Sequence, residues 1–389
     1  MPHLFEPLKL RDLVLRNRIG VPAMCQYSAR DGLANDWHFV HYSTRAVGGA
    51  GLIISEATAV APEGRISAAD LGLWCDAQIE PLARIVRFAR EQASPMAVQL
   101  AHAGRKASVG RGWESQTTIP GNEGGWQVVA PSAVPFSEKH AVPLELDAAG
   151  IGAIVAGFVE ATKRARAAGF SAVEIHGAHG YLLHQFLSPI ANRRTDAYGG
   201  SFDNRTRLLI EVVDAVRGVW PEHLPLLVRL SATDWVEGGW MPEETVELCR
   251  ILKTRGVDLI NVSTAGMTPN AKIPVGPGFQ TEFAEQVRRG AGIPTAAVGL
   301  ITSPAQADHI IRSGQADLVL LGREILRNPY WPLEAAQELG HIAAWPPQYL
   351  RSAPTGSVPR EGNTESSVSP ARTEGNFTEV PDSKFVPRG

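Results

Sequence analysis

The chain has 389 residues, of which 44% are hydrophobic and 20% are charged, and its formal net charge at pH 7 is -3. This composition fits a globular protein with a large core, and it lacks the basic excess that binding to nucleic acid or to an anionic membrane surface requires. Three scattered cysteines, Cys25, Cys75 and Cys249, do not suit a disulfide framework, and neither a secretory leader nor a run of roughly 18 apolar residues occurs. We therefore expect a cytoplasmic protein that handles small molecules.

Short apolar runs alternate with longer stretches of helical periodicity along the chain, which is typical of repeated βα units. The helical stretches include residues 81–92, 154–169, 204–219 and 243–256. Because strands covered by helices on both faces read as continuous apolar runs, eight such runs predict a (β/α)8 TIM barrel. A doubly wound open sheet is the alternative, although no GxGxxG follows the first run. The runs lie at residues 18–23, 51–57, 96–101, 170–177, 226–231, 258–263, 294–299 and 316–322.

Two segments depart from this repeat. Residues 102–143 connect the third run to a helix that we expect to begin near Asp147. A loop of that length inside a compact domain is typical of a lid or a binding element. Residues 352–389 contain no Leu, Ile, Trp or Tyr and are rich in polar residues, so we expect a disordered tail. The predicted organisation is one barrel domain, residues 1–351, followed by this tail.

Glycines end the last two apolar runs, at the edge where the C-terminal ends of barrel strands place functional groups. These are Gly299 and Gly322, and Arg323 follows the second directly. Barrels commonly bind phosphate at this position, because glycine lets backbone N–H groups approach the oxygens and arginine adds charge. The alternative is that the glycines only turn the chain.

The fourth run ends in EIHGAHGY, which contains His176, His179 and Tyr181. The two histidines fit three interpretations: core or capping residues, metal ligands, or hydrogen-bond donors to a substrate. A metal site would need further ligands, for which Asp234 is the one candidate that we find. As donors, two N–H groups aimed at one oxygen would stabilise negative charge there, and the tyrosine could supply a proton.

Arg229 lies within the apolar run LLVRLS, where an unpaired charge is costly. Its partner is either a buried carboxylate such as Glu174 or a bound group that carries negative charge. Cys25, taken alone, is more typical of a small buried side chain than of a reactive thiol. Gln99 and Lys106, taken alone, indicate no particular function.

Together these segments resemble the Old Yellow Enzyme family of flavin-dependent ene-reductases, in particular its thermophilic-like bacterial branch. The resemblance covers about residues 3–351 and is strongest in the histidine–tyrosine segment with its YGGS continuation. The segments that carry it are LFEPLKLRDLVLRNRI, PAMCQYSA, VQLAHAGRK, EIHGAHGYLLHQFLSPIANRRTDAYGGSFDNRTRLL, VRLSATDW and LGREILRNPYW.

The resemblance implies that FMN is held noncovalently at the mouth of the barrel, with NADPH or NADH as the reductant. In this family Gln99 would meet the pyrimidine edge of the flavin, Arg229 would lie near N1 and the C2 oxygen, and Lys106 would occupy a matching loop position. The residues that the resemblance assigns to FMN are Pro22, Ala23, Met24, Cys25, Ala57, Gln99, Arg229, Gly299, Gly322 and Arg323, the last three around the phosphate.

The resemblance also implies a reaction. His176 and His179 would bind the carbonyl or nitro oxygen of an activated alkene, or the oxygen of a phenolic ligand, and Tyr27 and Cys25 would be further substrate contacts. Hydride would pass from flavin N5 to the β-carbon, and a proton from Tyr181 to the α-carbon.

The stretch PPQYLR resembles a segment that reaches the active site of a neighbouring subunit, so we expect a homodimer or homotetramer in which Arg351 contributes to substrate binding. Alternatively, Arg351 merely begins the tail. Two other functions remain open: a metal-dependent barrel hydrolase that uses the histidines as ligands, and a flavoprotein that binds FMN or phenols without turnover. The first would be colourless, and the reduced flavin of the second would not be reoxidised by an enone.

Overall fold

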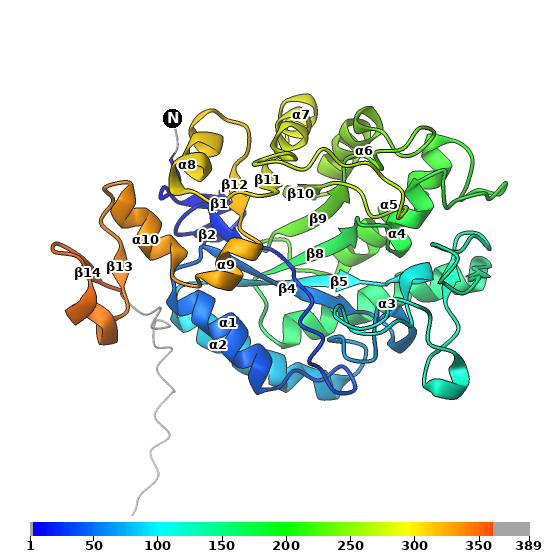
Figure 1. Cartoon of the computed structure of the whole chain (residues 1–389), viewed down its shortest axis with the longest axis horizontal. Helices are drawn as coiled ribbons and strands as arrows, with labels where there is room; N and C mark the ends of the chain where they lie inside the picture. The colour runs from blue at the N-terminus through cyan, green and yellow to red at the C-terminus, as the bar shows by residue number, and fades with distance from the viewer. Residues whose placement is uncertain (1–2, 361–389) are drawn as a thin grey trace, which may run out of the picture.

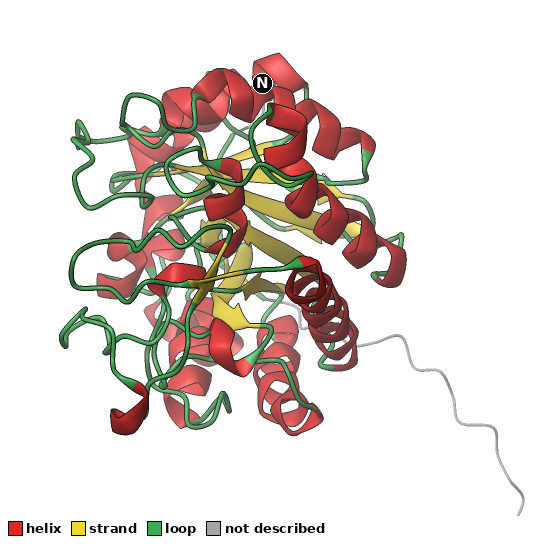
Figure 2. Ribbon diagram, turned by 90° about the vertical axis from the view of Figure 1, so that its right-hand side faces the viewer, coloured by secondary structure: helices red, strands yellow, loops and turns green. Residues whose placement is uncertain are grey.

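A closed barrel of eight parallel strands forms the centre of the computed structural model, which describes residues 3–360. The strands follow one another around the barrel in chain order, and helices surround them (Figures 1 and 2). Each predicted apolar run forms one strand, which confirms the (β/α)8 barrel and excludes the open sheet. The strands are β3 (Ile19–Val21), β4 (Leu52–Ala59), β5 (Met96–Ala101), β8 (Ala172–Gly177), β9 (Leu226–Ser231), β10 (Leu259–Ser263), β11 (Thr295–Val298) and β12 (Leu318–Leu320).

The helices begin where the sequence supplies capping side chains. The Asp147 carboxylate accepts a hydrogen bond from the Gly150 N–H at 2.7 Å, which places the start of α3 where we expected it. Ser201 caps α5 in the same way through the Asn204 N–H. The helices are α1 (Asp36–Val47), α2 (Ile79–Glu91), α3 (Ala148–Ala167), α4 (Leu182–Leu187), α5 (Phe202–Val219), α6 (Pro242–Thr254), α7 (Thr281–Ala291), α8 (Pro304–Arg312), α9 (Arg323–Arg327) and α10 (Trp331–Glu338).

The barrel interior is apolar at the N-terminal ends of its strands. An antiparallel hairpin of β1 (Leu8–Leu10) and β2 (Leu13–Leu15) lies against this end. Its buried leucines, Leu15 among them, belong to one apolar cluster with strand residues such as Ala97 and Leu227. The hairpin therefore closes the bottom of the barrel and leaves the C-terminal ends of the strands as its open mouth.

The long insertion between β5 and α3 has little regular structure, and it packs against the mouth. Ala107, Val109 and Val128 of the insertion form a buried cluster against which Tyr27 and Tyr181 pack. The insertion is thus a wall beside the predicted site residues. Its regular elements are two 3-10 turns (Gly104–Lys106 and Gly121–Glu123) and β6 (Val129–Ala130), which pairs in parallel with β7 (Leu144–Glu145).

The C-terminal segment differs from the expected boundary. Most of the predicted disordered tail, residues 361–389, lies outside the described residues, but residues 352–360 continue the fold. After a 3-10 turn (Pro347–Ser352), β14 (Val358–Pro359) pairs in parallel with β13 (Ala344–Trp345).

Arg360 anchors this segment to the body of the protein. Its side chain is buried, and the guanidinium donates to the carbonyl oxygens of Ala46 at 3.2 Å and Val47 at 3.1 Å. These carbonyls end α1, where the helix dipole favours a cation. Composition does not reveal a contact of this kind, and the described fold therefore extends past residue 351.

We expect Leu15→Ala to lower the free energy of unfolding by about 2–5 kcal/mol, because a fully buried leucine of the hairpin would leave a cavity beneath the barrel. Val14→Ala is the matched control, since Val14 is the adjacent residue and is 55% exposed, and it should change stability by about 0.5 kcal/mol or less. Urea denaturation measures both. Equal losses in the two variants would contradict the role of the hairpin.

Candidate active site

A layer of polar side chains occupies the barrel above the apolar layer. Strand pairing places Gln99 beside Glu174 and Arg229 beside Asn261. The Glu174 carboxylate accepts hydrogen bonds from Gln99 Nε2 at 2.7 Å and from Asn261 Nδ2 at 2.9 Å. Because inward-facing side chains recur at every second residue of a strand, each of these polar residues lies two positions after an inward apolar one. The four apolar residues are Ala97, Ala172, Leu227 and Leu259.

Arg229 is the cation of this layer and retains free hydrogen-bonding capacity. It is 7% exposed, and burial lowers the pKa of its guanidinium while the nearby Glu174 charge opposes that shift. Among residues 3–360, its Nε has no hydrogen-bond partner and no carboxylate forms an ion pair with it. Glu174 is therefore an electrostatic neighbour of Arg229, and the donors of the guanidinium are available to a bound anion.

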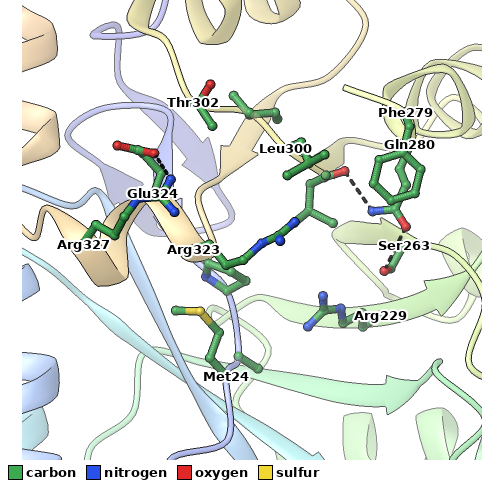
Figure 3. A pocket seen from close by; sticks show the side chains of 16 residues that line it. Met24, Arg229, Ser263, Phe279, Gln280, Leu300, Thr302, Arg323, Glu324 and Arg327 are labelled. Carbon is green, nitrogen blue, oxygen red and sulfur yellow. Dashed lines mark hydrogen bonds and ion pairs between the residues drawn. The ribbon is translucent and has the colours of Figure 1, made fainter. Parts of the chain in front are cut away.

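A cavity of about 390 Å³ opens beside Arg229, within the range of roughly 300–1,000 Å³ typical of ligand sites. Figure 3 shows Arg229 and Arg323 reaching toward this space from β9 and from the start of α9. Arg323 is exposed and makes no hydrogen bond to residues 3–360, so two guanidinium groups are available to one ligand. The predicted cofactor residues that line the cavity are Pro22, Ala23, Met24, Arg229, Gly299, Gly322 and Arg323.

The glycines of this cavity keep its wall open. Gly299 has a φ of 126°, a conformation that residues with a side chain rarely adopt, and an added Cβ would lie 3.0 Å from Gln280 Nε2. Gly322 directly precedes α9, and an added Cβ there would lie 4.0 Å from the side chains of Met24 and Pro22. The arrangement fits an elongated ligand that carries negative charge at both the Arg229 and the Arg323 ends.

The histidine–tyrosine segment lies at the end of β8, beside this cavity. The ring of His176 lies 5.1 Å from the rings of both His179 and Tyr181, measured between centroids. His176 Nδ1 accepts from the Ala178 N–H at 3.3 Å, which favours the tautomer with its proton on Nε2. His179 adopts a φ of 58°, and its N–H donates to Ser231 Oγ at 3.0 Å. The structure thus brings the three predicted side chains together.

Burial keeps both imidazoles neutral. Desolvation lowers the pKa of His176 and of His179 well below the ordinary value, and the charge of Arg229 lowers both further. His179 Nε2 lies 2.8 Å from Ser263 Oγ, and the Ser263 hydroxyl also lies within hydrogen-bond distance of Gln280 Oε1. Because the Ser263 hydroxyl donates to Gln280 Oε1, its oxygen can accept a hydrogen bond from the Nε2–H of His179. Each ring can then offer an Nε2–H donor.

Cys25, Tyr27 and Tyr181 gather around a buried carboxylate, that of Asp70. Asp70 and Tyr181 line a second, small cavity of about 10 Å³, together with the predicted flavin contact Ala57. Burial raises the pKa of the Cys25 thiol and of both tyrosines, and the Asp70 charge raises each of them further. All three groups therefore keep their protons at neutral pH.

The loop that carries Cys25 is tied down by a buried network around Glu56. The Gln26 N–H donates to Glu56 Oε2 at 2.8 Å, and Tyr42 OH and His38 Nε2 each lie 3.3 Å from Glu56 Oε1. This network joins α1, β4 and the loop after β3. It holds the backbone of residues 22–27 in place at the cavity wall.

Arg351 is the predicted site residue that the structure places elsewhere. It is exposed in the 3-10 turn after α10 and lines neither cavity. In Figure 1 this segment lies at the opposite end of the molecule from the insertion.

Sequence reasoning also overlooked several residues of the site: Asp70, Ser231 and Ser263, and Trp113 of the insertion, whose ring lies 5.9 Å from that of Tyr27. An aspartate or a serine after a strand carries no distinguishing signal by itself.

Among residues 3–360, no group of three or more His, Cys, Asp and Glu side chains is placed to hold a metal ion. No helix in this part of the chain combines the length and the apolar character that crossing a bilayer requires.

Comparisons with known proteins identify relatives of this site and fold. The model of the NADH:flavin oxidoreductase / NADH oxidase family matches residues 3–341. An NADPH dehydrogenase of Listeria innocua is 49% identical over 354 residues, which cover 90% of this chain and 99% of that protein. Among solved structures, morphinone reductase aligns with a TM-score of 0.73 and 30% identity, over 88% of this chain and 90% of its own. The Old Yellow Enzyme homologue from Zymomonas mobilis aligns with a TM-score of 0.74 and 27% identity, over 91% and 99% of the two chains.

Asp70 gives the site a measurable pH dependence. Burial raises the pKa of its carboxyl from 3.8 to about 7, although hydrogen bonds from Ser67 and from the Ile66 N–H oppose the shift. Since the folded state holds this proton more tightly than the unfolded state, ionisation of Asp70 costs stability as the pH rises from about 4 to about 7. We expect the stability of Asp70→Asn relative to the wild type to rise over this range and to level off above it.

Urea denaturation at about pH 5 and about pH 8 measures this difference. Asp12→Asn is the control, because Asp12 is exposed and replacing it removes the same charge. A stability difference between Asp70→Asn and the wild type that does not change with pH would contradict the assignment.

Proposed function

We propose that this chain, which belongs to the NADH:flavin oxidoreductase / NADH oxidase family, reduces the activated C=C bond of α,β-unsaturated carbonyl or nitro compounds with NADPH or NADH. It is an FMN-dependent oxidoreductase of the Old Yellow Enzyme type. The observation that carries the proposal is the group of two neutral imidazoles and a protonated tyrosine, in which the His176 ring lies 5.1 Å from the rings of both His179 and Tyr181, beside a cavity lined with arginine.

The cavity residues fit FMN. The unpaired Nε of Arg229 suits an electron-rich, partly anionic ring edge, and Gly299, Gly322 and Arg323 suit a phosphate. Pro22, Ala23 and Met24 would form the wall against the ring system. When bound, FMN supplies the hydride that is delivered to the β-carbon of the alkene.

The histidines would bind and polarise the substrate oxygen. Two Nε2–H groups directed at one carbonyl or nitro oxygen stabilise the negative charge that develops there, and neutral rings can donate without taking up a proton first. His179 would exchange its contact with Ser263 for the substrate oxygen. Phenolic ligands carry an oxygen that the same two donors fit.

Tyr181 would protonate the α-carbon. Its pKa lies well above 10 because of burial and the nearby Cys25, Tyr27 and Asp70, so it holds its proton until a strongly basic carbon forms. Cys25 and Tyr27 pack against the same apolar cluster as Tyr181 and would be further substrate contacts. The histidines make the alkene electron-poor, and the tyrosine completes the reduction.

The protein would act as a homodimer or homotetramer. Arg351 is exposed and lines neither cavity of its own barrel, which suits a contribution to the active site of a neighbouring subunit. A guanidinium delivered in this way could bind a negatively polarised group on the substrate.

Replacing Tyr181 with phenylalanine should slow reoxidation of the reduced enzyme by cyclohexenone by roughly 10²–10⁴-fold, the contribution expected of a general acid. Reduction of the flavin by NADPH should remain close to the wild-type rate, because that step needs no proton from Tyr181. Anaerobic stopped-flow absorbance separates the two half-reactions.

Tyr198→Phe is the matched control, since the Tyr198 hydroxyl contacts Glu211 and the residue lies outside both cavities. Reoxidation of Tyr181→Phe at the wild-type rate would remove the tyrosine from the mechanism. A wild-type enzyme that neither enones nor nitroalkenes reoxidise would overturn the proposed substrate class.

Arg351→Ala should weaken apparent substrate affinity by roughly 10-fold, the loss expected for one charged hydrogen bond, while the protein still elutes as an oligomer. Steady-state kinetics and size-exclusion chromatography provide the two measurements. Arg289→Ala, at another exposed arginine, is the control. Unchanged affinity, or elution of the wild type as a monomer, would remove the idea of a shared site.

A further inference from the structure

Lys106 joins three of the loops at the barrel mouth and lies against the proposed proton donor. It ends the 3-10 turn Gly104–Lys106 after β5, and its Nζ donates to the carbonyl oxygens of His179 at 2.8 Å and Gly266 at 3.1 Å. We propose that Lys106 holds His179 in its donor position and that its positive charge stabilises the phenolate that forms on Tyr181 during proton transfer. This inference rests on the proposed function and adds a residue to it.

The two loops that Lys106 joins are in direct backbone contact. An added Cβ on Gly180 would lie 2.0 Å from the Gly266 carbonyl oxygen, and one on Gly266 would lie 2.5 Å from His179 Cα. Two carbonyl oxygens consequently point into one small space, where an ammonium group can satisfy both. His179 has a φ of 58°, so its backbone conformation needs outside support. Lys106 supplies that support from the loop after β5.

The remaining surroundings of the ammonium group are aromatic. Nζ lies 4.9 Å from the ring centroid of Tyr181 and 4.6 Å from that of Phe136 in the insertion. A cation over a neutral phenol ring is already favourable, and it is more favourable once the ring carries the charge of a phenolate. The geometry therefore stabilises the product of proton donation more than its starting state, as a catalytic contact must.

The proton balance of this step is simple. The Tyr181 O–H bond breaks, a C–H bond forms at the α-carbon, and the O–H electron pair stays on the phenolate. Hydride addition at the β-carbon, which the reductant supplies, leaves the α-carbon basic enough to take the proton. Water later returns a proton to the phenolate, and Lys106 itself gives up none.

A rise in pH can remove the positive charge of Lys106 while its amine keeps its hydrogen bonds, so pH distinguishes the effect of the charge from that of the contacts. Burial, and secondarily the charge of Arg105, lower the pKa of Lys106 to about 8. The other titratable groups around it are His176, His179, Tyr181 and His140, and none of the first three changes protonation near pH 8, because burial shifts their pKa values away from it. His140 also has a lowered pKa, so it stays neutral there. A neutral amine still donates two N–H groups, so raising the pH through about 8 removes the charge and keeps the contacts.

The test compares Lys106→Met, which has a similar shape and no charge, with Lys106→Arg, which keeps the charge. Anaerobic stopped-flow measures reoxidation of each reduced enzyme by cyclohexenone from about pH 6 to about pH 10. We expect cyclohexenone to reoxidise reduced Lys106→Met at least roughly 10-fold more slowly than the reduced wild type. The variant should lose part of the rate acceleration that Tyr181 provides as the general acid. In the wild type the rate should fall as the pH rises through about 8. Lys106→Met should lack this fall and keep only the effect of Asp70, whose pKa is about 7 and whose charge acts on Tyr181 in both enzymes. Lys106→Arg should keep its rate above that pH.

A double-mutant cycle with Tyr181→Phe separates this role from a purely structural one. If Lys106 acts through the tyrosine, Lys106→Met should add little to the defect of Tyr181→Phe, whereas a structural role would add its full effect.

Lys163→Met, at an exposed lysine on α3, is the matched control. The stability of the purified variants, measured by urea denaturation, reports loss of the hydrogen bonds to His179 and Gly266. If Lys106→Met does not fold, the pH profiles of the wild type and of Lys106→Arg test the charge: the wild-type rate should fall above about pH 8, and that of Lys106→Arg should not.

Several results would overturn this inference. They are wild-type rates in Lys106→Met, an undiminished effect of Lys106→Met in the Tyr181→Phe background, or a wild-type rate that does not fall between about pH 7 and about pH 9. In each case the wild type would still reduce enones, and the proposed function would stand. A wild type that no enone reoxidises would overturn both.

Discussion

The site depends on one buried carboxylate, that of Glu174 inside the barrel. An isolated charge in that position would cost several kcal/mol, about the order of the whole stability of a domain. Gln99 and Asn261 supply hydrogen bonds at 2.7 and 2.9 Å, and Arg229 supplies the opposite charge. Gln99 and Arg229 lie on β5 and β9, the two strands that flank β8, and Asn261 lies on β10, the strand after β9. The strand register that builds the barrel is therefore the register that neutralises Glu174.

The same register builds the chemistry above this layer. Two residues beyond Glu174, Arg229 and Asn261 lie His176, Ser231 and Ser263, which follow the same inward alternation. Ser231 accepts from the His179 N–H, and Ser263 lies 2.8 Å from His179 Nε2. The histidines proposed to bind the substrate are thus positioned by contacts with the ends of β9 and β10, together with the Lys106 contact from the loop after β5.

The sequence predicts the barrel well because buried parallel strands are read from local apolar runs, and it predicts the strand-end residues because barrel topology brings them to one edge. It does not predict Asp70, since a carboxylate becomes functional there only through burial by segments distant in the sequence. It also does not reveal the contacts of residues 352–360. A polar composition indicates disorder, yet Arg360 secures residues 352–360 through carbonyl oxygens at the end of α1, a contact that only the folded chain creates.

Charge is divided across the mouth of the barrel. Arg229 and Arg323 make the main cavity cationic, whereas carboxylates act on the neighbouring group of Cys25, Tyr27 and Tyr181: Asp70 on all three, and Glu56 on the first two. The cationic side favours an anionic ligand and lowers the basicity of the histidines, so they donate as neutral rings. The carboxylate side keeps the thiol and phenols protonated. The two parts of the mouth therefore hold their titratable groups in different protonation states, because the fixed charges beside them have opposite signs.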